Sequence, residues 1–183
     1  MQIKLVHISI IILLVQSIPC YGQNHYLDKE GYNRSTLKYS DFSDLNKTLY
    51  GKAVVTDGDS LKISNRRIRL LGIDAPELNQ KCSDINGLIY PCGRISKDAL
   101  IKKVSFKNVI CYFKNTDRYG RVITVCWLDK VNINSWLVLN GYAVAYRRYS
   151  KAFIKDEMRA RETKKGIWSG KFEKPEVWRR MNR

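Results

Sequence analysis

Acidic side chains and one arginine gather in two short segments that lie close together along the chain. The first segment, TDGDS, contains Asp57 and Asp59. The second, RLLGIDAPE, contains Arg69, Asp74 and Glu77. Carboxylates can bind a hard cation such as calcium through oxygen atoms alone, and a guanidinium can donate two parallel hydrogen bonds to a phosphate. Taken singly, each Asp is equally compatible with a turn-forming residue, and Arg69 with a solvated strand residue.

A basic turn, DRYGR, follows in the second half of the chain. It begins at Asp117 and contains Arg118, Tyr119 and Arg121. Guanidinium groups match phosphate oxygens in a way that the ammonium of lysine does not. Alone, this segment is a generic basic turn. Together with Tyr146, which lies later in the chain, Arg118 and Tyr119 are the candidates for contacts with a substrate.

The positions of the two histidines exclude several kinds of catalysis. His7 lies in an apolar N-terminal segment and His25 in the polar segment after it, so the rest of the chain has none. Nucleophilic catalysis by Ser-His or Cys-His pairs, His-based ribonuclease chemistry and His-bound zinc all need an imidazole. Hydrolysis by this chain would therefore need carboxylates, arginines and a hard metal ion.

Hydrophobic periodicity predicts the elements that position these residues. Alternating apolar residues predict strands, and apolar residues at helical spacing that end at a glycine predict helices. The expected strands cover residues 49–56, 61–63, 67–70, 109–113 and 122–127. The expected helices cover residues 93–104, a short segment capped by Asn132 or Asn134 that stops at Gly141, and a segment from about Lys151 to Gly166.

The predicted strand order places the acidic residues at one end of a hairpin. Asp59 precedes the second strand and Asp74 follows the third, and a hairpin folds these two ends together, so the two carboxylates can share one cation. Five short strands with a helix after the third suit an α+β fold, namely a five-stranded barrel of the oligonucleotide-binding (OB) type flanked by about three α-helices. Other α+β arrangements are compatible with the same order.

Residues 1–22 have the features of a secretory signal peptide. Lys4 supplies a positive start, an apolar stretch of roughly 14 residues follows, and small residues precede the expected cleavage site after Gly22. The stretch is shorter than the roughly 20 residues of a membrane-spanning helix, so no span is expected after cleavage. An uncleaved anchor and lipid attachment at Cys20 are the alternatives. We expect residues 23–47 to form a polar flexible leader and residues 48–183 the folded domain of a protein secreted to the periplasm or the medium.

Four cysteines remain after removal of the signal segment, at positions 82, 92, 111 and 126. An even number in an exported chain indicates two disulfides. Three pairings are possible, and short separations favour Cys82 with Cys92 across a loop and Cys111 with Cys126 across neighbouring strands. For the second pair, buried free thiols are the alternative.

The chain is strongly basic. Its formal net charge is +16, and loss of the single lysine in residues 1–22 leaves +15. Such a charge attracts polyanions over long distances and predicts binding that weakens steeply with salt. The charge by itself does not distinguish a nucleic acid from an anionic membrane surface.

Three motifs, DGDS, RLLGIDAPE and DRYGR, resemble those of the staphylococcal-nuclease-like (thermonuclease) family in residue type and in order. The resemblance implies that Asp59 and Asp74 bind calcium through their carboxylates and Ala75 through its backbone carbonyl, with Asp57 as a nearby acid. Ala75 stands where the best-known member of the family has a threonine, and Ser60 also stands in place of a threonine. The loss of the hydroxyl at Ala75 leaves the carbonyl in place, so metal binding should survive.

The resemblance covers roughly residues 49–169 and also implies the catalytic residues. Arg69 and Arg121 correspond to the two catalytic arginines of the family, and Glu77 corresponds to its catalytic glutamate. Glu77 is expected to assist a water that attacks phosphorus. Tyr146 does not fall in the register of the best-known member, so its contact with substrate is a prediction from the sequence alone.

The activity that the resemblance implies is that of a calcium-dependent endonuclease. Its substrates would be DNA and RNA, single strands preferred, its products would carry 3′-phosphates, and the protein would be a monomer. Two other classes share part of the pattern: a catalytically inactive OB-fold module that binds nucleic acid, and a small basic secreted protein that acts on anionic membranes. Neither needs acids clustered beside arginines, so the complete set argues for the enzyme.

Overall fold

The computed structural model describes residues 48–182, and the expected signal peptide (1–22) and the expected leader (23–47) lie outside these residues. Its main sheet follows the order β1-β8-β9-β4-β3-β2, with β10 paired to β9. The bounds of these strands are Thr48–Lys52 for β1, Val54–Asp57 for β2, Ser60–Ile63 for β3, Arg66–Leu70 for β4, Asn108–Thr116 for β8, Val122–Leu128 for β9 and Val131–Asn132 for β10.

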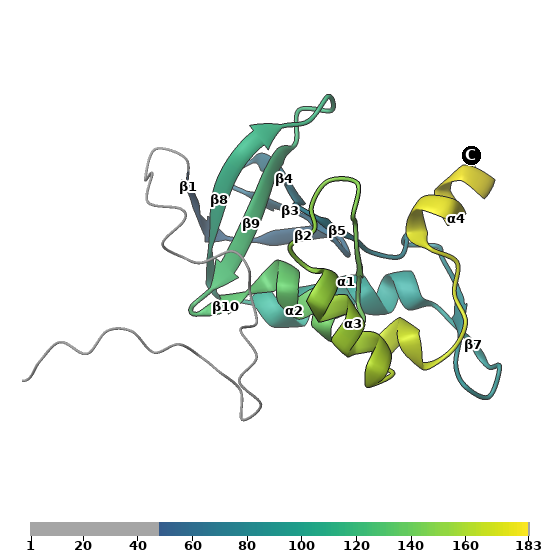
Figure 1. Cartoon of the computed structure of the whole chain (residues 1–183). Coiled ribbons are helices and arrows are strands. Elements are labelled where there is room, and N and C mark those ends of the chain that lie inside the picture. The colour runs from purple at the N-terminus through teal and green to yellow at the C-terminus, as the bar shows by residue number, and fades with distance from the viewer. Residues whose placement is uncertain (1–47, 183) are drawn as a thin grey trace, which may run out of the picture.

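The sheet curls because its first two strands are consecutive in sequence but lie at opposite ends of the strand order. Only Ala53 separates β1 from β2, yet β1 pairs with β8 and β2 with β3. The sheet must therefore bend until its two edges meet, which Figure 1 shows as a half-barrel. The single parallel pair, β4 with β9, links the two hairpins. This arrangement confirms the predicted α+β fold with an OB-type barrel.

Helices and two small strand pairs complete the fold. The helices are α1 (Cys92–Val104), α2 (Ile133–Leu139), α3 (Ile154–Glu162) and α4 (Pro175–Met181), with a 3-10 helix η3 at Gly166–Ser169. The small pairs are β5 (Ile73–Asp74) with β11 (Val144–Ala145), and β6 (Cys82–Ser83) with β7 (Ile89–Tyr90). In Figure 1, α1, α2 and α3 lie together under the curled sheet, whereas α4 stands apart from them, near the C-terminus.

The predicted strands and helices are present, and the described residues add the short strands β5, β6, β7, β10 and β11 and the 3-10 helix η3. The expected strand 49–56 is two strands, because the chain crosses from one sheet edge to the other at Ala53. Asn132, and not Asn134, caps α2, since its side chain accepts a hydrogen bond from the backbone nitrogen of Ser135 at 3.0 Å. Helix α4 was not expected, so the described residues contain four α-helices where about three were predicted.

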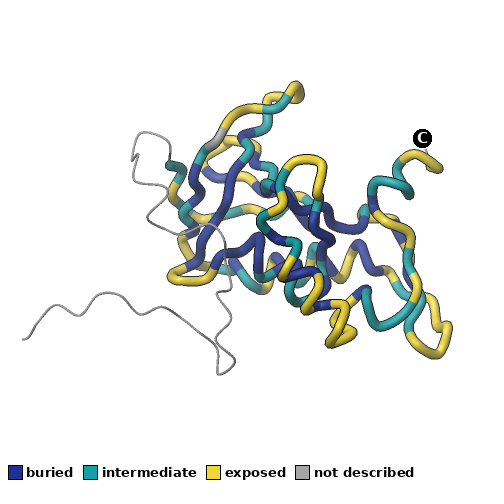
Figure 2. Tube along the Cα trace, in the orientation of Figure 1, coloured by how far each residue is buried: buried dark blue, intermediate teal, exposed yellow. Residues whose placement is uncertain are grey.

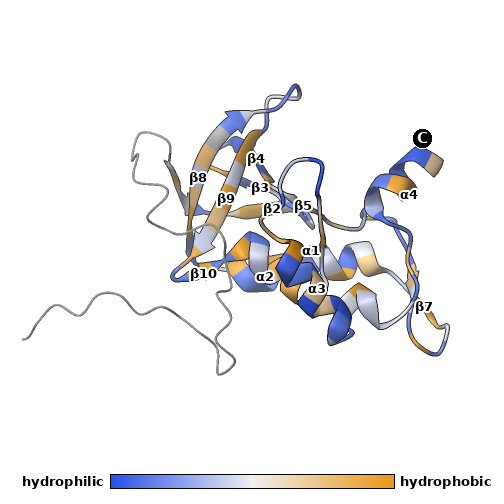
Figure 3. Cartoon of the chain, in the orientation of Figure 1, coloured by the Kyte–Doolittle hydropathy of each residue, from blue (hydrophilic) through white to orange (hydrophobic). Residues whose placement is uncertain are grey.

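Alternation along β4 divides the barrel core from the site side. Ile68 and Leu70 are almost completely buried, while Arg69 between them points to the opposite face of the strand. Burial of an aliphatic side chain of this size contributes roughly 1.5–3 kcal/mol. Figure 2 shows the buried stretches running along the strands and along α1 and α2, and Figure 3 shows that hydrophilic residues cover much of α3.

Among residues 48–182, none of the helices has the length and apolar character that a membrane crossing requires.

The structure confirms both predicted disulfides. Cys82 is joined to Cys92 across the loop that precedes α1, and Cys111 to Cys126 across the paired strands β8 and β9. Cys111 and Cys126 are directly opposite each other in the strand register and are fully buried. The free-thiol alternative for this pair is therefore not realised, and two disulfides are consistent with an extracellular or periplasmic location.

Removal of the Cys111–Cys126 disulfide should lower the free energy of unfolding by about 3 kcal/mol. The estimate follows from the chain entropy that a 15-residue cross-link removes from the unfolded state. Urea denaturation of a Cys111→Ala/Cys126→Ala variant, followed by tryptophan fluorescence, measures the change, with Cys82→Ala/Cys92→Ala as the comparison. A loss below about 1 kcal/mol would contradict the prediction, because it would mean that the bond does not constrain the unfolded chain.

Candidate active site

The β3–β4 hairpin brings Asp59, Arg69 and Asp74 into contact. Ser60 pairs with Arg69 in the strand register, so Asp59, one residue earlier, lies beside the arginine. The Nη1 atom of Arg69 donates to Asp59 Oδ1, and Nη2 donates to Asp74 Oδ1 at 2.9 Å. A backbone hydrogen bond of 3.0 Å from Leu70 to the Asp59 carbonyl fixes the same corner. The two predicted ends of the hairpin thus meet around one guanidinium.

Burial gives this cluster unusual electrostatics. Asp59 and Asp74 are 2% and 1% exposed. Burial raises the pKa of the Asp74 carboxyl, and the negative charge of Asp59 raises it further. A hydrogen bond from Arg179 lowers the pKa of Asp74 but does not outweigh these two effects. Burial likewise raises the pKa of Asp57, with help from Asp59. For Arg69, burial alone would lower the pKa, but the carboxylates of Asp59 and Asp74 outweigh it and the pKa is raised. All three shifts favour the protonated form of the group, which is neutral for Asp57 and Asp74 and positively charged for Arg69.

The turn that carries Asp57 and Asp59 packs tightly against neighbouring elements. Asp59 Oδ2 accepts a hydrogen bond from the backbone nitrogen of Ala75 at 3.0 Å. A Cβ atom at Gly58 would lie 2.7 Å from Ser96 Oγ on α1 and 2.8 Å from the Ala75 Cβ. Only glycine permits this approach, which fixes the carboxylate of Asp59 beside Ala75.

The backbone around Glu77 is held by Gln80 and by the start of α1. Gln80 is fully buried, and its Oε1 atom accepts a hydrogen bond from the Glu77 backbone nitrogen at 3.1 Å. Its own backbone nitrogen donates to the Glu77 carbonyl at 2.7 Å. A Cβ atom at Gly93 would lie 1.8 Å from that carbonyl oxygen, so α1 approaches closely only because this position is glycine. The Glu77 side chain, about a quarter exposed, extends from a fixed backbone.

Arg179, on α4, is part of the cluster although no sequence motif pointed to it. Its Nη2 atom donates to Asp74 Oδ2 at 2.9 Å, and its Nη1 atom donates to Asp74 Oδ1 at 2.9 Å and to Glu77 Oε1 at 2.6 Å. Burial would lower the pKa of Arg179, but the hydrogen bonds that it donates to Asp74 and Glu77 raise its pKa well above the usual range. The segment KPEVWRR, with a proline before basic residues, is typical of a short helix, but no pattern in it tells which arginine reaches the acids.

Arg121 lies in its own turn and is not in contact with the acids. Its Nε atom donates to Asp117 Oδ2 at 2.8 Å, and its backbone nitrogen donates to Asp117 Oδ1 at 2.9 Å. Burial opposes ionisation of Asp117, but these hydrogen bonds dominate and lower its pKa. Within residues 48–182, the ion pair of Arg121 is with Asp117 and not with the acidic cluster. The predicted site is therefore divided between two segments.

The predicted substrate-contact residues lie in two separate segments. Tyr119 is exposed at the tip of the β8–β9 turn, and the guanidinium carbons of Arg118 and Arg121 lie 5.0 and 5.4 Å from its ring centroid. Tyr146 directly follows β11, which pairs with β5. Burial raises the pKa of Tyr146, and the negative charges of Glu176 on α4 and of Asp74 raise it further.

The donor chemistry of the cluster fits a hard cation. Asp57, Asp59, Asp74 and Glu77 offer oxygen atoms only, which suit calcium or magnesium and not the softer metals. Within the described residues, no three His, Cys, Asp or Glu side chains are placed together as a metal site. The arginines instead occupy the oxygens of Asp74 that a cation would use.

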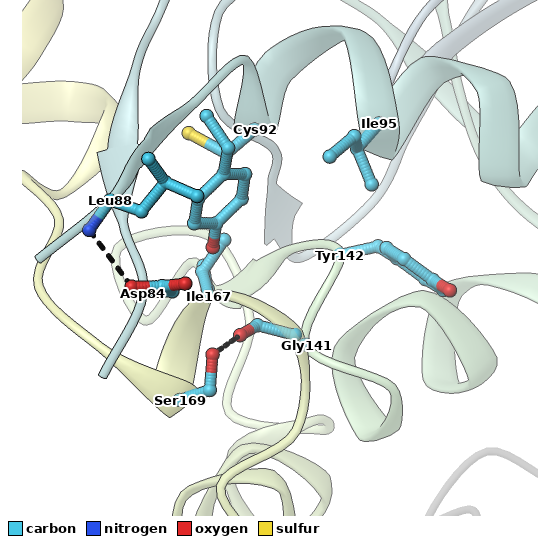
Figure 4. A pocket seen from close by; sticks show the side chains of 10 residues that line it. Asp84, Leu88, Cys92, Ile95, Gly141, Tyr142, Ile167 and Ser169 are labelled. Atoms are coloured by element: carbon cyan, nitrogen blue, oxygen red, sulfur yellow. Dashed lines mark hydrogen bonds between the residues drawn. The ribbon is translucent and has the colours of Figure 1, made fainter. Parts of the chain in front are cut away.

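A pocket of about 330 Å³ lies on another part of the molecule, beside the Cys82–Cys92 loop (Figure 4). Asp84 shapes this loop by accepting a hydrogen bond from the Leu88 backbone nitrogen at 2.9 Å. The lining is mainly apolar, with Leu88, Ile95 and Ile167 among its residues, and none of the acidic cluster contributes to it. The cavity therefore does not mark the candidate site.

Comparison with known proteins gives the family. The model of the family described as staphylococcal nuclease homologue matches residues 67–170, which is more than half of the chain. The match begins after Asp59 and ends before α4. The motif that holds the first acid and the helix that holds Arg179 therefore lie on either side of it.

Three relatives illustrate the range of similar proteins. The chain is 36% identical over 123 residues to the succinoglycan biosynthesis protein ExoI of Rhizobium meliloti, 33% over 135 residues to the probable staphylococcal-like nuclease CAN3 of Oryza sativa subsp. japonica, and 32% over 140 residues to an uncharacterized endonuclease of Escherichia coli. These alignments cover 66%, 72% and 72% of this chain. They span 64% of the Rhizobium protein, 33% of the rice protein and 85% of the E. coli protein. On its fold, its acidic and basic cluster and these matches, the chain belongs to the staphylococcal nuclease homologue family.

Proposed function

We propose that this protein is a calcium-dependent endonuclease that hydrolyses phosphodiester bonds of DNA and RNA, with single strands preferred, and leaves 3′-phosphates. The observation that carries the proposal is the buried pair of Asp59 and Asp74 around Arg69, with Glu77 joined to the same group through Arg179. In a member of a nuclease family, acids and guanidinium groups at one place are the groups that phosphodiester hydrolysis requires.

Asp59 and Asp74 would hold the calcium ion, with the Ala75 carbonyl as a further ligand and Asp57 as an acid beside them. When bound, calcium supplies a Lewis acid that polarises a phosphate oxygen. Asp59 is well placed for this role because the Ala75 backbone and the Gly58 turn fix its carboxylate. Both aspartates are buried, so the attraction between their carboxylates and a bound cation would be screened little by solvent.

Glu77 would accept a proton from the attacking water, and the arginines would stabilise the phosphate. Arg69 and Arg121 would donate hydrogen bonds to the equatorial oxygens as negative charge develops on them, after which the 5′ P–O bond breaks. Arg118, Tyr119 and Tyr146 would contact the nucleic acid strand on either side. The flat rings of the tyrosines suit base stacking, and the arginine suits backbone phosphate.

The proposed location is outside the cytoplasm. The two disulfides support export, and the sequence of residues 1–22 predicts a cleaved signal peptide. The net charge of +16 supports a polyanionic substrate such as nucleic acid, which the family match also implies.

The purified mature protein should cleave single-stranded DNA and RNA in the presence of calcium and should lose this activity when a chelator is added. Oligonucleotides with a 5′ fluorophore, separated on a denaturing gel, measure the rate, and a mobility shift of the labelled product after phosphatase treatment shows that its new 3′ end carried a phosphate. An Asp74→Asn variant is the control for a contaminating nuclease.

Two results would separate this proposal from its alternative. Absence of calcium-dependent cleavage at every pH tested would contradict the enzyme. Salt-dependent binding of the same oligonucleotides without cleavage would instead favour an inactive OB-fold module that uses its basic surface alone.

A further inference from the structure

Helix α4 carries its arginine to the oxygens that the proposed calcium ion would use. Three of the hydrogen bonds to Asp74 and Glu77 come from the Arg179 guanidinium, and both carboxylate oxygens of Asp74 are occupied by it. Calcium binds carboxylate oxygens at about 2.3–2.6 Å. A cation and the guanidinium therefore cannot use these oxygens in the same geometry, and their like charges repel each other.

The start of α4 is fastened to the body of the protein. Lys171 exchanges two backbone hydrogen bonds with Ser83, of 2.9 and 3.0 Å. Gln80, which holds the Glu77 backbone, also donates from Nε2 to the carbonyl of Glu173 at 2.6 Å. Pro175, at the first position of the helix, is buried. One buried glutamine thus sets the distance between the Glu77 loop and α4, which places Arg179 over the acids.

Arg179 and Arg69 differ in how firmly they are held, because the end of α4 is exposed. Met181 is 70% exposed, and the side chain of Arg179 is 30% exposed. Arg69 is 16% exposed and lies on β4, which is paired with β3 on one side and β9 on the other. A strand held from both sides cannot move aside without loss of sheet hydrogen bonds, whereas a short helix with an exposed end can. Of the two arginines, Arg179 is the one that an incoming cation can displace.

We propose that the side chain of Arg179 competes with calcium for the same carboxylates. It pairs with Asp74 and Glu77 in the metal-free protein and is displaced when calcium binds. Arg179 thereby sets the calcium concentration at which the site loads. This inference rests on the proposed calcium-dependent function. Because Arg179 belongs to the same chain, it competes at an effective concentration in the millimolar range. The apparent calcium affinity is then reduced in proportion to the fraction of molecules in which Arg179 has left the acids. Displacement also frees the Glu77 carboxylate from its ion pair with Arg179.

The first test compares calcium affinity in Arg179→Gln and Arg180→Gln by isothermal titration calorimetry. Arg180 is the matched control because it is the next residue on α4, is exposed, and removes the same charge. The Arg179 variant should bind calcium about 10- to 100-fold more tightly than the wild type, because charge-assisted hydrogen bonds no longer compete. The Arg180 variant should stay within about twofold, as expected for an exposed charge.

The second test follows α4 directly by hydrogen exchange of the backbone amides of residues 176–181. In the wild type, addition of calcium should reduce their protection, because the helix loses its attachment to the acids. In Arg179→Gln the same amides should exchange rapidly even without calcium. Arg179→Lys, which keeps the charge but not the forked geometry, should lie between the two and replaces the glutamine variant if circular dichroism shows that the latter is unfolded.

The outcomes separate this inference from the function on which it rests. Equal calcium affinity in the wild type and both variants, or α4 protection that is unchanged as calcium saturates, would overturn the role of Arg179 alone. Absence of calcium binding in all three proteins would overturn the proposed metal dependence and this inference together.

Discussion

Replacement of Glu77 by Gln should lower kcat for calcium-dependent cleavage by about 10²- to 10⁴-fold, the range expected for loss of a general base. Glutamine keeps the shape of the side chain and an oxygen that accepts from Arg179, but it cannot take a proton from water. The backbone should be unaffected, because Gln80 and Gly93 hold the Glu77 main chain and not its carboxylate. The rate is measured with single-stranded DNA at saturating calcium, and calorimetry shows whether metal is still bound.

The matched control for this variant is Glu162→Gln. Glu162 is exposed at the end of α3, so its replacement removes the same charge from a helix that does not contribute to the site. Its kcat should remain close to that of the wild type. A Glu77→Gln rate within about threefold of the control would mean that the carboxylate is not the base and serves instead to pair with an arginine.

The central part of the site could be predicted from sequence because it depends on local geometry. The alternation of Ile68, Arg69 and Leu70 defines the face of the strand, and the register of a tight hairpin then places Asp59 beside Arg69. Asp74 follows within four residues of the strand end. These relations span few residues, so the periodicity of the sequence was sufficient to predict that the side chains meet.

Helix α4 could not be predicted because its position depends on contacts between distant residues. Arg179 meets Asp74 across 105 residues and Glu77 across 102. The link between them is the buried amide of Gln80, a residue type that gives no motif and is more often exposed. The family match also ends before α4, so the family model gives no indication of the role of the helix.

The strand expected at residues 49–56 shows a different limit. The segment has the composition of one strand, yet β1 and β2 pair with different partners on the two edges of the curled sheet. Closure of the sheet, and not the local pattern, decides where one strand ends and the next begins. The barrel that carries the site is therefore a property of the whole domain, while the hairpin inside it is local.

The structure places two arginines in different relations to the acids. Arg69 is inside the cluster and pairs with both Asp59 and Asp74, whereas Arg121 is held by Asp117 in the turn that joins β8 and β9. A phosphate bound between the two segments would receive donors from both sides. The ion pair of Arg121 uses Nε, so its two terminal nitrogens take no part in the bond to Asp117. Asp117 thus orients a fork that fits two phosphate oxygens.

Arg121→Lys should lower kcat by about 10²- to 10³-fold, the cost of losing one preorganised donor in a transition state, while the fold is retained. Lysine keeps the positive charge but replaces the planar fork with a single ammonium that Asp117 cannot orient in the same way. Calcium affinity should be unchanged, because Arg121 does not contact the acidic cluster. KM should rise less than kcat falls, since the lost interaction is made mainly in the transition state. Arg159→Lys, an exposed arginine on α3, is the control for the change of side chain. A kcat for Arg121→Lys equal to that of this control would show that the turn binds nucleic acid through charge alone and would remove Arg121 from the catalytic group.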